Sequence, residues 1–301
     1  MNQKVYITKH LVEDLRKECD GRAVNGVFFL VDENTRKLCL PLLMEDDFFS
    51  KVTVIEIKAN DDHKTLESLV SVWTSLQKNG ATRKSLMINL GGGMVTDLGG
   101  FAASTFKRGM EYVNVPTTLL GAVDAAVGGK TGINFGGLKN EIGVINSSKS
   151  VVINADFFRT LDAENLRSGY AEMIKHGLIS NTEIWKHILS FDLDNVDYNR
   201  LSELLLESIS VKEKVVEIDP TEKGLRKVLN FGHTVGHAFE SYAMEIGKPV
   251  LHGYAVAWGM ISELYLSYKL LGFPKEALST AVRMIKENYG ALPIKCDIYD
   301  H

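Results

Sequence analysis

Short apolar runs alternate with helix-like segments over the first half of the chain, and this alternation limits the folds that are available to it. Several of the runs carry apolar residues at consecutive positions, which is typical of strands buried on both faces. Helix-like segments such as residues 63–80 lie between them. We therefore expect a mostly parallel sheet covered by helices. The strands are expected at residues 26–31, 51–57, 85–90, 112–115 and 150–154.

After about Asp156 the pattern changes to long amphipathic helices. Residues 200–218 and 257–272 place apolar side chains at helical spacing. A chain of 301 residues with 45% hydrophobic content can bury two cores. We expect an N-terminal α/β domain, residues 1–155, followed by an all-α domain, residues 156–301.

Composition excludes several other classes of protein. The net charge of −4 and the lack of a basic stripe argue against a general nucleic-acid binder. Apolar runs all fall short of the roughly 18 residues that cross a membrane, and the N-terminus shows no signal-type apolar core. Cys19, Cys39 and Cys296 are odd in number and lack CxxC spacing, so we expect neither a disulfide framework nor a cysteine zinc site. A reducing cytoplasm fits this composition.

Glycines follow the strand expected at residues 85–90. Gly91, Gly92 and Gly93 predict a turn into a helix whose first amides face a phosphate. The loop does not match the GxGxxG fingerprint, because position 96 is Thr, and a plain turn before a helix is the alternative. Asp32 and Asn34 end an earlier strand, at an edge where ribose hydroxyls are commonly bound.

A second glycine-rich segment spans residues 115–143. Lysines among glycines can approach a phosphate or carboxylate without a bulky neighbour. Apolar residues within the segment argue against the alternative of a mobile surface loop, so we expect an anionic ligand here. The polar residues of this segment are Asp124, Lys130, Asn134, Lys139 and Asn140.

The second half carries a candidate metal site. Glu172, His233 and His252 offer one carboxylate and two imidazoles, which suit zinc or a similar divalent ion and leave a position open for a substrate oxygen. Lys175 lies one helical turn after Glu172 and is expected on the same face.

Three polar residues precede or follow His233, the first of these histidines, at helical spacing. On one continuous helix all four would share a face that lines an anionic pocket, and the alternative is a solvated helix face. The four residues are Arg226, Asn230, His233 and His237.

Ordered motifs across residues 26–273 resemble the 3-dehydroquinate synthases, a family of sugar phosphate cyclases. The resemblance implies a Rossmann-like NAD-binding α/β domain, a helical metal-binding domain, an active site in the cleft between them, and a homodimer. The motifs are GGGMVTDLGGFAAST, KRG, VPTTLLGAVDAAVGGKTGIN, LKNEIG, GYAEMIKHGLI, LNFGHTVGHAFE and LHGYAVAWGM.

Motif by motif, the resemblance implies a role for individual residues. It makes Glu172, His233 and His252 the metal ligands, and zinc or cobalt the metal. It places Arg108 on a substrate phosphate, from the partner subunit. The implied catalytic residues are Asp124, Lys130, Lys175, Asn230 and His237. The implied substrate-binding residues are Arg108, Lys139, Asn140 and Arg226. The implied NAD-binding residues are Asp32, Asn34, Lys64, Gly92, Gly93, Asp97, Thr117, Thr118, Lys130 and Lys139.

The family reaction converts 3-deoxy-D-arabino-heptulosonate 7-phosphate into 3-dehydroquinate and phosphate, a step of the shikimate pathway to aromatic amino acids. Transient oxidation by NAD acidifies a neighbouring carbon, phosphate leaves by β-elimination, the hydride returns, and an intramolecular aldol step closes the ring. His237 is expected to move protons, because imidazole titrates near neutral pH.

The chain departs from the family pattern at three places. Members usually continue with another helical hairpin and a lysine pair, so the C-terminus is expected to be shortened, with Lys286 and Lys295 as speculative substitutes. Tyr254 stands where Glu is usual, beside His252, and Asp61 stands where Glu is frequent.

Three alternative functions remain open on the sequence alone. They are another cyclase such as a 2-deoxy-scyllo-inosose synthase, a metal-dependent polyol dehydrogenase of the glycerol dehydrogenase type, and a non-catalytic NAD-binding or dimer-partner protein.

Overall fold

The computed structural model describes residues 3–292 and divides the chain into two compact units. Unit 1 comprises Met1–Asp162 and Tyr198–Glu213, and unit 2 comprises Ala163–Asp197 and Lys214–His301. Residues 155–162 continue unit 1, because Phe157 packs into its core. The functional domain boundary expected after residue 155 stays a prediction.

Unit 1 contains a six-stranded parallel sheet in the order β1-β8-β5-β4-β2-β3. The expected α/β class is thus confirmed. β1 was not expected, since it has four residues and is only partly buried. The strands are β1 Lys4–Ile7, β2 Val27–Asp32, β3 Thr53–Ile57, β4 Leu86–Gly91, β5 Glu111–Pro116 and β8 Ser150–Ile153.

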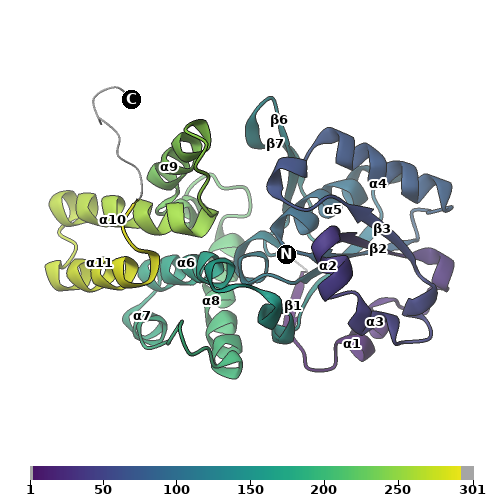
Figure 1. Cartoon of the computed structure of the whole chain (residues 1–301), viewed down its shortest axis with the longest axis horizontal. Coiled ribbons are helices and arrows are strands. Elements are labelled where there is room, and N and C mark those ends of the chain that lie inside the picture. The colour runs from purple at the N-terminus through teal and green to yellow at the C-terminus, as the bar shows by residue number, and fades with distance from the viewer. Residues whose placement is uncertain (1–2, 293–301) are drawn as a thin grey trace. The chain divides into compact units, whose positions relative to one another are not determined.

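Helices cover both faces of this sheet (Figure 1). Alternate side chains of β2 show why its sequence is continuously apolar. Phe29 packs into a core with Leu15 of α1, whereas Phe28 packs into a second core with Leu69 of α4. The helices of this part are α1 Leu11–Glu18, α2 Glu33–Leu38, α3 Pro41–Met44, α4 Leu66–Lys78 and α5 Gly93–Thr105.

The second glycine-rich segment forms a π-helical turn and a β-hairpin. The turn η5, Gly121–Ala125, carries Asp124, and the antiparallel strands β6 Lys130–Phe135 and β7 Leu138–Ile145 follow it. A Cβ at Gly143 would lie 2.0 Å from the carbonyl oxygen of Thr131, so the strand pairing requires glycine there. The 3-10 helices of unit 1 are η1 Val24–Gly26, η2 Phe49–Lys51, η3 Asp61–His63, η4 Phe106–Arg108 and η6 Ala155–Thr160.

Every regular element described after residue 162 is a helix, as expected. α10 packs against α6, α9 and α11 within unit 2 (Figure 1). The first part of α8 belongs to unit 1 and its end to unit 2. The helices are α6 Ala163–Ile179, α7 Thr182–Leu189, α8 Tyr198–Ile218, the 3-10 helix η7 Leu225–Asn230, α9 His233–Glu245, α10 His252–Leu271 and α11 Lys275–Tyr289.

The expectation of one continuous helix from Arg226 to His237 was wrong. The 3-10 helix η7 ends at Asn230, and α9 begins at His233 after a left-handed Gly232 with φ of +80°. A Cβ at Gly232 would lie 2.5 Å from Met260 Cγ of α10, so the glycine serves both the turn and the helix contact. Arg226 and Asn230 therefore share η7, and His233 and His237 share α9.

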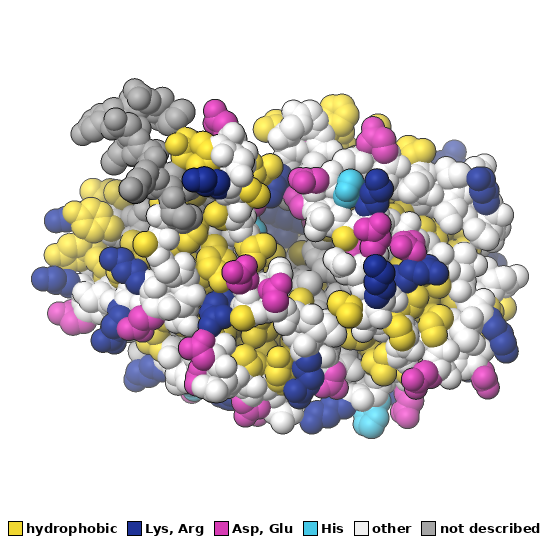
Figure 2. Space-filling view, viewed as in Figure 1, with side chains coloured by type: hydrophobic (Ala, Val, Ile, Leu, Met, Phe, Trp, Pro, Cys, Tyr) yellow, Lys and Arg dark blue, Asp and Glu magenta, His cyan; other side chains and the backbone are white. Residues whose placement is uncertain are grey.

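The surface carries charges of both signs. Figure 2 shows lysine, arginine and acidic side chains interspersed over the face in view. Among the described residues, no helix is both long and apolar enough to cross a membrane.

Candidate active site and metal centre

Three helices of unit 2 bring the predicted metal ligands together. Glu172 lies fully buried on α6, and His233 and His252 are the first residues of α9 and α10. Oε1 of Glu172 lies 3.4 Å from Nε2 of His233 and 3.7 Å from Nε2 of His252. Ligands of one tetrahedral zinc ion lie roughly 3.3–3.6 Å apart, given metal–ligand distances of about 2.0–2.2 Å. Both oxygen–nitrogen distances therefore lie close to the spacing between ligands of one divalent ion.

The other ring nitrogen of each imidazole faces an acceptor. Nδ1 of His233 lies 3.2 Å from the carbonyl oxygen of Phe231, and Nδ1 of His252 lies 3.3 Å from Oε2 of Glu240. A proton on Nδ1 leaves the Nε2 lone pair for a metal. Both histidines are thus arranged as Nε2 ligands.

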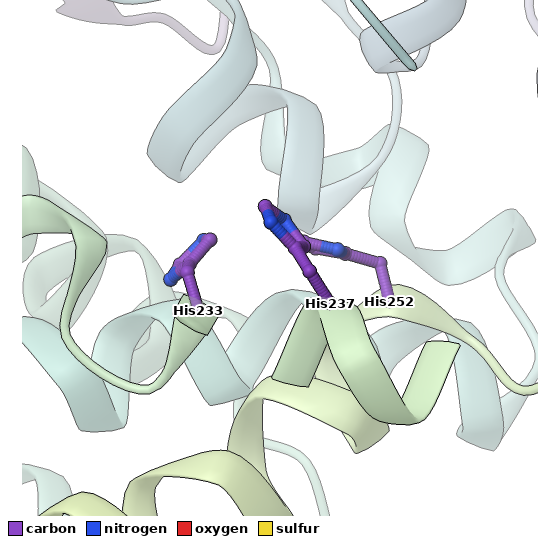
Figure 3. A group of neighbouring side chains, drawn as sticks. All are labelled: His233, His237 and His252. Carbon is purple, nitrogen blue, oxygen red and sulfur yellow. The ribbon is translucent and has the colours of Figure 1, made fainter. Parts of the chain in front are cut away.

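His237 offers an alternative third ligand. A nitrogen of each of His233, His237 and His252 lies within 4.8 Å of the others, and Figure 3 shows the three side chains on the same side of their helices. The ring centroids of His233 and His237 are 5.3 Å apart. Glu172 supplies the buried negative charge that a cation needs, whereas His237 is exposed. This contrast favours Glu172 as the ligand and leaves His237 beside it.

Glycines set the spacing between α9 and α10. A Cβ at Gly259 would lie 2.1 Å from the carbonyl oxygen of Gly232, and one at Gly236 would lie 3.0 Å from that of Ala255. The two helix axes can approach closely only with glycine at these positions. The glycines of the GHTVGH segment therefore help to place His233 near His252.

Lys175 and Glu172 form a fully buried ion pair on α6, three residues apart as expected from their spacing. The ammonium balances part of the negative charge at the site. Burial disfavours a charged imidazole, but Glu172 and Glu240 outweigh it and raise the pKa of His252 to about 9. Metal binding at Nε2 must displace that proton, so metal affinity is linked to pH.

Arg226 and Asn230 border the same part of unit 2. Arg226 is 2% exposed, and its Nη1 donates to the carbonyl oxygen of Pro220 at 2.8 Å. Nδ2 of Asn230 donates to Oε1 of Glu222 at 2.8 Å. Asn230 also lines a cavity of about 710 Å³. The cavity is lined by Thr221, Glu222, Lys227, Val228, Asn230, Phe231, Thr234 and Glu263.

In unit 1, the expected glycine turn joins β4 to α5. Gly92 is the N-cap of α5, and the amide of Thr117 donates to the carbonyl oxygen of Gly91 at 3.0 Å. A Cβ at Gly92 would lie 3.0 Å from Cγ2 of Thr118 and one at Gly93 would lie 3.1 Å from Cβ of Ala125. The turn thus combines bare backbone with a helix N-terminus, an arrangement that suits a pyrophosphate.

Asp32 is the last residue of β2, the strand beside β4 in the sheet. The connection from β3 crosses to the other side of β2, so the carboxyl ends of β2 and β4 flank the switch in strand order where open α/β sheets bind nucleotides. Oδ1 of Asp32 accepts hydrogen bonds from the amides of Asn34 and Thr35, at 2.9 and 2.8 Å. These bonds cap α2 and fix the carboxylate at this edge.

Lys64 is the centre of a buried polar network in unit 1. It is 4% exposed, and its Nζ lies 3.0 Å from Oδ2 of Asp97 and 2.5 Å from Oδ1 of Asn140. Asp61 approaches Lys64 and Lys139, at 3.5 Å in each case. The network therefore joins residues that the sequence assigns to NAD with residues assigned to the substrate. It also includes Asp61, which stands where the family frequently has Glu.

The carboxylates of this network differ in their pKa. Burial raises the pKa of Asp97 to about 6, although Lys64 opposes the shift. Burial also disfavours ionisation of Asp61, but Lys64 and Lys139 outweigh it and hold the pKa of Asp61 below its usual value. Asp97 consequently titrates at the acid edge of the physiological range.

Lys212 is a candidate that sequence reasoning missed. This buried lysine of α8 places Nζ 2.6 Å from Oδ1 of Asp124 and 2.5 Å from its carbonyl oxygen. The sequence contained an indication of this role. Ser208 and Lys212 continue, at helical spacing, the buried face of α8 that carries Leu201 and Leu205, so two polar residues interrupt an apolar face.

Lys130 and Arg108 are exposed in unit 1. Arg108 follows Lys107, and both adopt positive φ, at +68° and +50°. Two successive non-glycine residues in this region mark a strained turn, which is frequently a functional one.

Two family models match successive parts of the chain. The model of the 3-dehydroquinate synthase N-terminal region matches residues 54–168, and that of the C-terminal region matches residues 169–300. The 3-dehydroquinate synthase of Parabacteroides distasonis is 52% identical over 298 residues, which cover 99% of this chain and 84% of the relative.

Two solved structures are similar in fold. The 2-epi-5-epi-valiolone synthase of Streptomyces hygroscopicus, with NAD+ and Zn2+ bound, has a TM-score of 0.85 and 25% identity, covering 98% of this chain and 82% of that one. A 2-deoxy-scyllo-inosose synthase complexed with carbaglucose-6-phosphate, NAD+ and Co2+ has a TM-score of 0.84 and 23% identity, covering 96% and 80%.

Proposed function

The chain belongs to the 3-dehydroquinate synthase family, and on that premise we propose a role for each group of site residues in the family reaction. That reaction converts 3-deoxy-D-arabino-heptulosonate 7-phosphate into 3-dehydroquinate and phosphate, with NAD and a divalent metal as cofactors. The observation that carries the assignment is the convergence of Glu172, His233 and His252 on one point.

The metal ligands in this proposal are Oε1 of Glu172 and the Nε2 atoms of His233 and His252. Zinc or cobalt fits this donor set. When bound, the metal polarises neighbouring substrate oxygens as a Lewis acid, and NAD accepts and later returns a hydride. Lys175 limits the excess negative charge around Glu172 and offers a cation toward an anionic substrate.

His237 is the proposed proton carrier. It lies one turn after His233 on α9, with its ring centroid 5.8 Å from that of His252. An exposed imidazole that is not required as a ligand can take a proton from a substrate hydroxyl and return it later. Asn230 is proposed to orient the same substrate by hydrogen bonding.

Several cations and amides are proposed to hold the anionic substrate. Guanidinium groups bind carboxylate and phosphate in two-point contacts, and lysines add point charges. We add Lys212 to this set, since its ion pair with Asp124 holds both side chains in a fixed arrangement. The remaining members are Arg108, Lys130, Lys139, Asn140 and Arg226.

NAD is proposed to bind across the switch in strand order of unit 1. The glycine turn at Gly92 and Gly93 would receive the pyrophosphate, and Asp32 and Asn34 would face a ribose. Lys64 and Asp97 would support the nucleotide from the buried network, with Thr117 and Thr118 beside the turn.

We also propose a homodimer in which Arg108 serves the partner's site. Its exposure and its strained turn support a role outside its own unit. Variants Arg108→Ala and His233→Ala, each inactive alone, should regain activity when mixed and allowed to exchange subunits, because one intact site forms per mixed dimer. Mixtures that remain inactive despite subunit exchange would exclude the shared site. The buried thiols of Cys19 and Cys39 fit the reducing cytoplasm expected for the protein.

An assay of products tests the overall proposal. The heptulosonate phosphate is supplied with zinc or cobalt, with and without NAD+, and phosphate, dehydroquinate and NADH are measured together. The proposal expects equal amounts of phosphate and dehydroquinate, strict dependence on NAD+ and no accumulating NADH. Accumulating NADH without phosphate would identify a polyol dehydrogenase instead. Conversion of glucose 6-phosphate in place of the heptulosonate would identify an inosose synthase.

A further inference from the structure

Glu240 is a buried carboxylate of α9 that has no role in the function proposed above. It is 6% exposed, and its Oε2 lies 3.3 Å from Nδ1 of His252. Burying a carboxylate is costly unless it is paired and hydrogen-bonded. The contact with the imidazole therefore needs an explanation beyond packing.

The geometry of the imidazole supplies one. Nδ1 and Nε2 are different edges of one ring, and Nε2 of His252 lies 3.7 Å from Oε1 of Glu172. A carboxylate accepts hydrogen bonds and does not donate them, so Nδ1 facing Glu240 carries a proton. Nε2 is then the nitrogen on the side of Glu172 that a metal would bind, in exchange for the proton it carries there.

Helix spacing makes this contact possible. Glu240 lies seven residues after His233, so α9 presents both side chains on one face. Gly236 lies between them, at a place where a Cβ would be 3.0 Å from the carbonyl oxygen of Ala255. The close approach of α10 lets the carboxylate on α9 reach the first residue of α10.

His233 provides an internal comparison. Its Nδ1 faces the backbone carbonyl of Phe231, which no side-chain substitution removes. For His252, the acceptor that faces Nδ1 is a side chain from a different helix. Of the two acceptors that orient the imidazoles, Glu240 is thus the one that a side-chain substitution can remove.

We propose that Glu240 is a positioning residue for the metal site, holding His252 in the Nδ1–H tautomer and in the orientation that presents Nε2 to the ion. The inference rests on the proposed metal ligands. It adds a fourth residue that does not touch the metal. Acceptors of this kind affect metal affinity by about 10-fold to 100-fold in other sites.

Zinc affinity of the metal-free protein, measured by competition with a chromophoric chelator, tests the proposal. Glu240→Ala should weaken zinc binding by about 10-fold to 100-fold. Glu240→Gln keeps an acceptor oxygen and should recover a large part of that loss. Glu245→Ala removes an exposed carboxylate from the same helix and should bind zinc like the parent protein. The visible spectrum of bound cobalt should change for Glu240→Ala and not for Glu245→Ala.

The outcomes separate the two levels of inference. Failure of the parent protein to bind zinc or cobalt would overturn the proposed metal site itself. Zinc affinity and a cobalt spectrum unchanged in Glu240→Ala, with a lowered melting temperature of the metal-free form, would show that Glu240 is only structural. If Glu240→Ala does not fold, Glu240→Met decides, because it keeps the side-chain length without an acceptor, and an unchanged cobalt spectrum with parent-like zinc affinity in this variant would equally overturn the proposal.

Discussion

The amide nitrogen of Gly253 lies 3.0 Å from the hydroxyl oxygen of Ser168, and this contact joins the start of α10 to α6. Gly253 directly follows His252, and Ser168 lies one helical turn before Glu172. A Cβ at Gly253 would lie 1.9 Å from the carbonyl oxygen of Ser168. The distance between two of the proposed metal ligands, Glu172 and His252, is therefore set by a helix contact that only glycine permits.

Gly253→Ala should weaken metal binding without changing any ligand. The added methyl group pushes the start of α10 away from α6, at a cost of about 1–3 kcal/mol in the free energy of unfolding. Zinc titration and denaturant unfolding measure the two effects. Gly26→Ala is the matched control, since the nearest atom to its added Cβ is 3.9 Å away and φ is negative there. Parent-like zinc affinity in Gly253→Ala would show that the contact does not set the ligand spacing.

Lys64→Met should weaken NAD+ binding by at least about tenfold, or about 1.4 kcal/mol. The substitution removes the cation between Asp97 and Asn140 and leaves the carboxyl group of Asp97 buried without it. Isothermal titration with NAD+ is the measurement. Lys58→Met, at an exposed position just after β3, is the control and should bind NAD+ normally. Equal affinities in both variants would remove Lys64 from the nucleotide site.

Asp97 should make the protein less stable as pH rises from about 4 to about 6. Its pKa is about 6 in the folded chain, against about 4 when unfolded, so the folded state binds more protons within this window. The free energy of unfolding of the parent, relative to Asp97→Asn, should fall by at most about 3 kcal/mol across it. Urea unfolding at several pH values measures the difference. A difference that is constant or rises with pH would contradict the raised pKa.

Lys212→Met should lower kcat/KM for the heptulosonate phosphate by roughly 10-fold to 100-fold, or about 1.4–2.7 kcal/mol of transition-state stabilisation. The change removes a buried cation and frees Asp124 from its ion pair. Lys214→Met alters an exposed lysine of the same helix and serves as the control. Steady-state assays at fixed concentrations of NAD+ and zinc measure kcat/KM for both variants. Identical kcat/KM values for the two variants would restrict Lys212 to a structural role.

Hydrophobic pattern alone was sufficient to predict most of the fold. The apolar runs that correspond to β2, β4, β5 and β8 lie in a sheet that is buried on both faces. Nearly every residue of these strands is therefore buried, which explains why the runs are continuously apolar. β1 was not predicted, because it is short and only partly buried, and because it pairs with a strand more than a hundred residues away. The hairpin of β6 and β7 was missed because glycines there serve strand pairing rather than a loop.

The candidate site was only partly predictable. Residue types and motifs suffice to propose Glu172, His233 and His252 as metal ligands, whereas Glu240 and Lys212 are recognised only through the side chains that they contact on other elements. Helical spacing gave a wrong prediction at Gly232, because its left-handed φ separates η7 from α9. A Cβ at this position would also clash with Met260. Lys286 lies on α11, whereas Lys295 lies outside the described residues. Tyr254, in place of the usual Glu, packs its ring against Trp258 and Tyr289.

A crystal structure of the zinc-loaded protein, with anomalous diffraction recorded at the zinc edge, tests the central claim most directly. The account predicts one strong anomalous peak within about 2.0–2.2 Å of Oε1 of Glu172 and Nε2 of His233 and His252, with His237 outside the coordination shell. A peak held by His233, His237 and His252, with Glu172 outside the coordination shell, would contradict it and would leave the reaction without its proposed proton carrier.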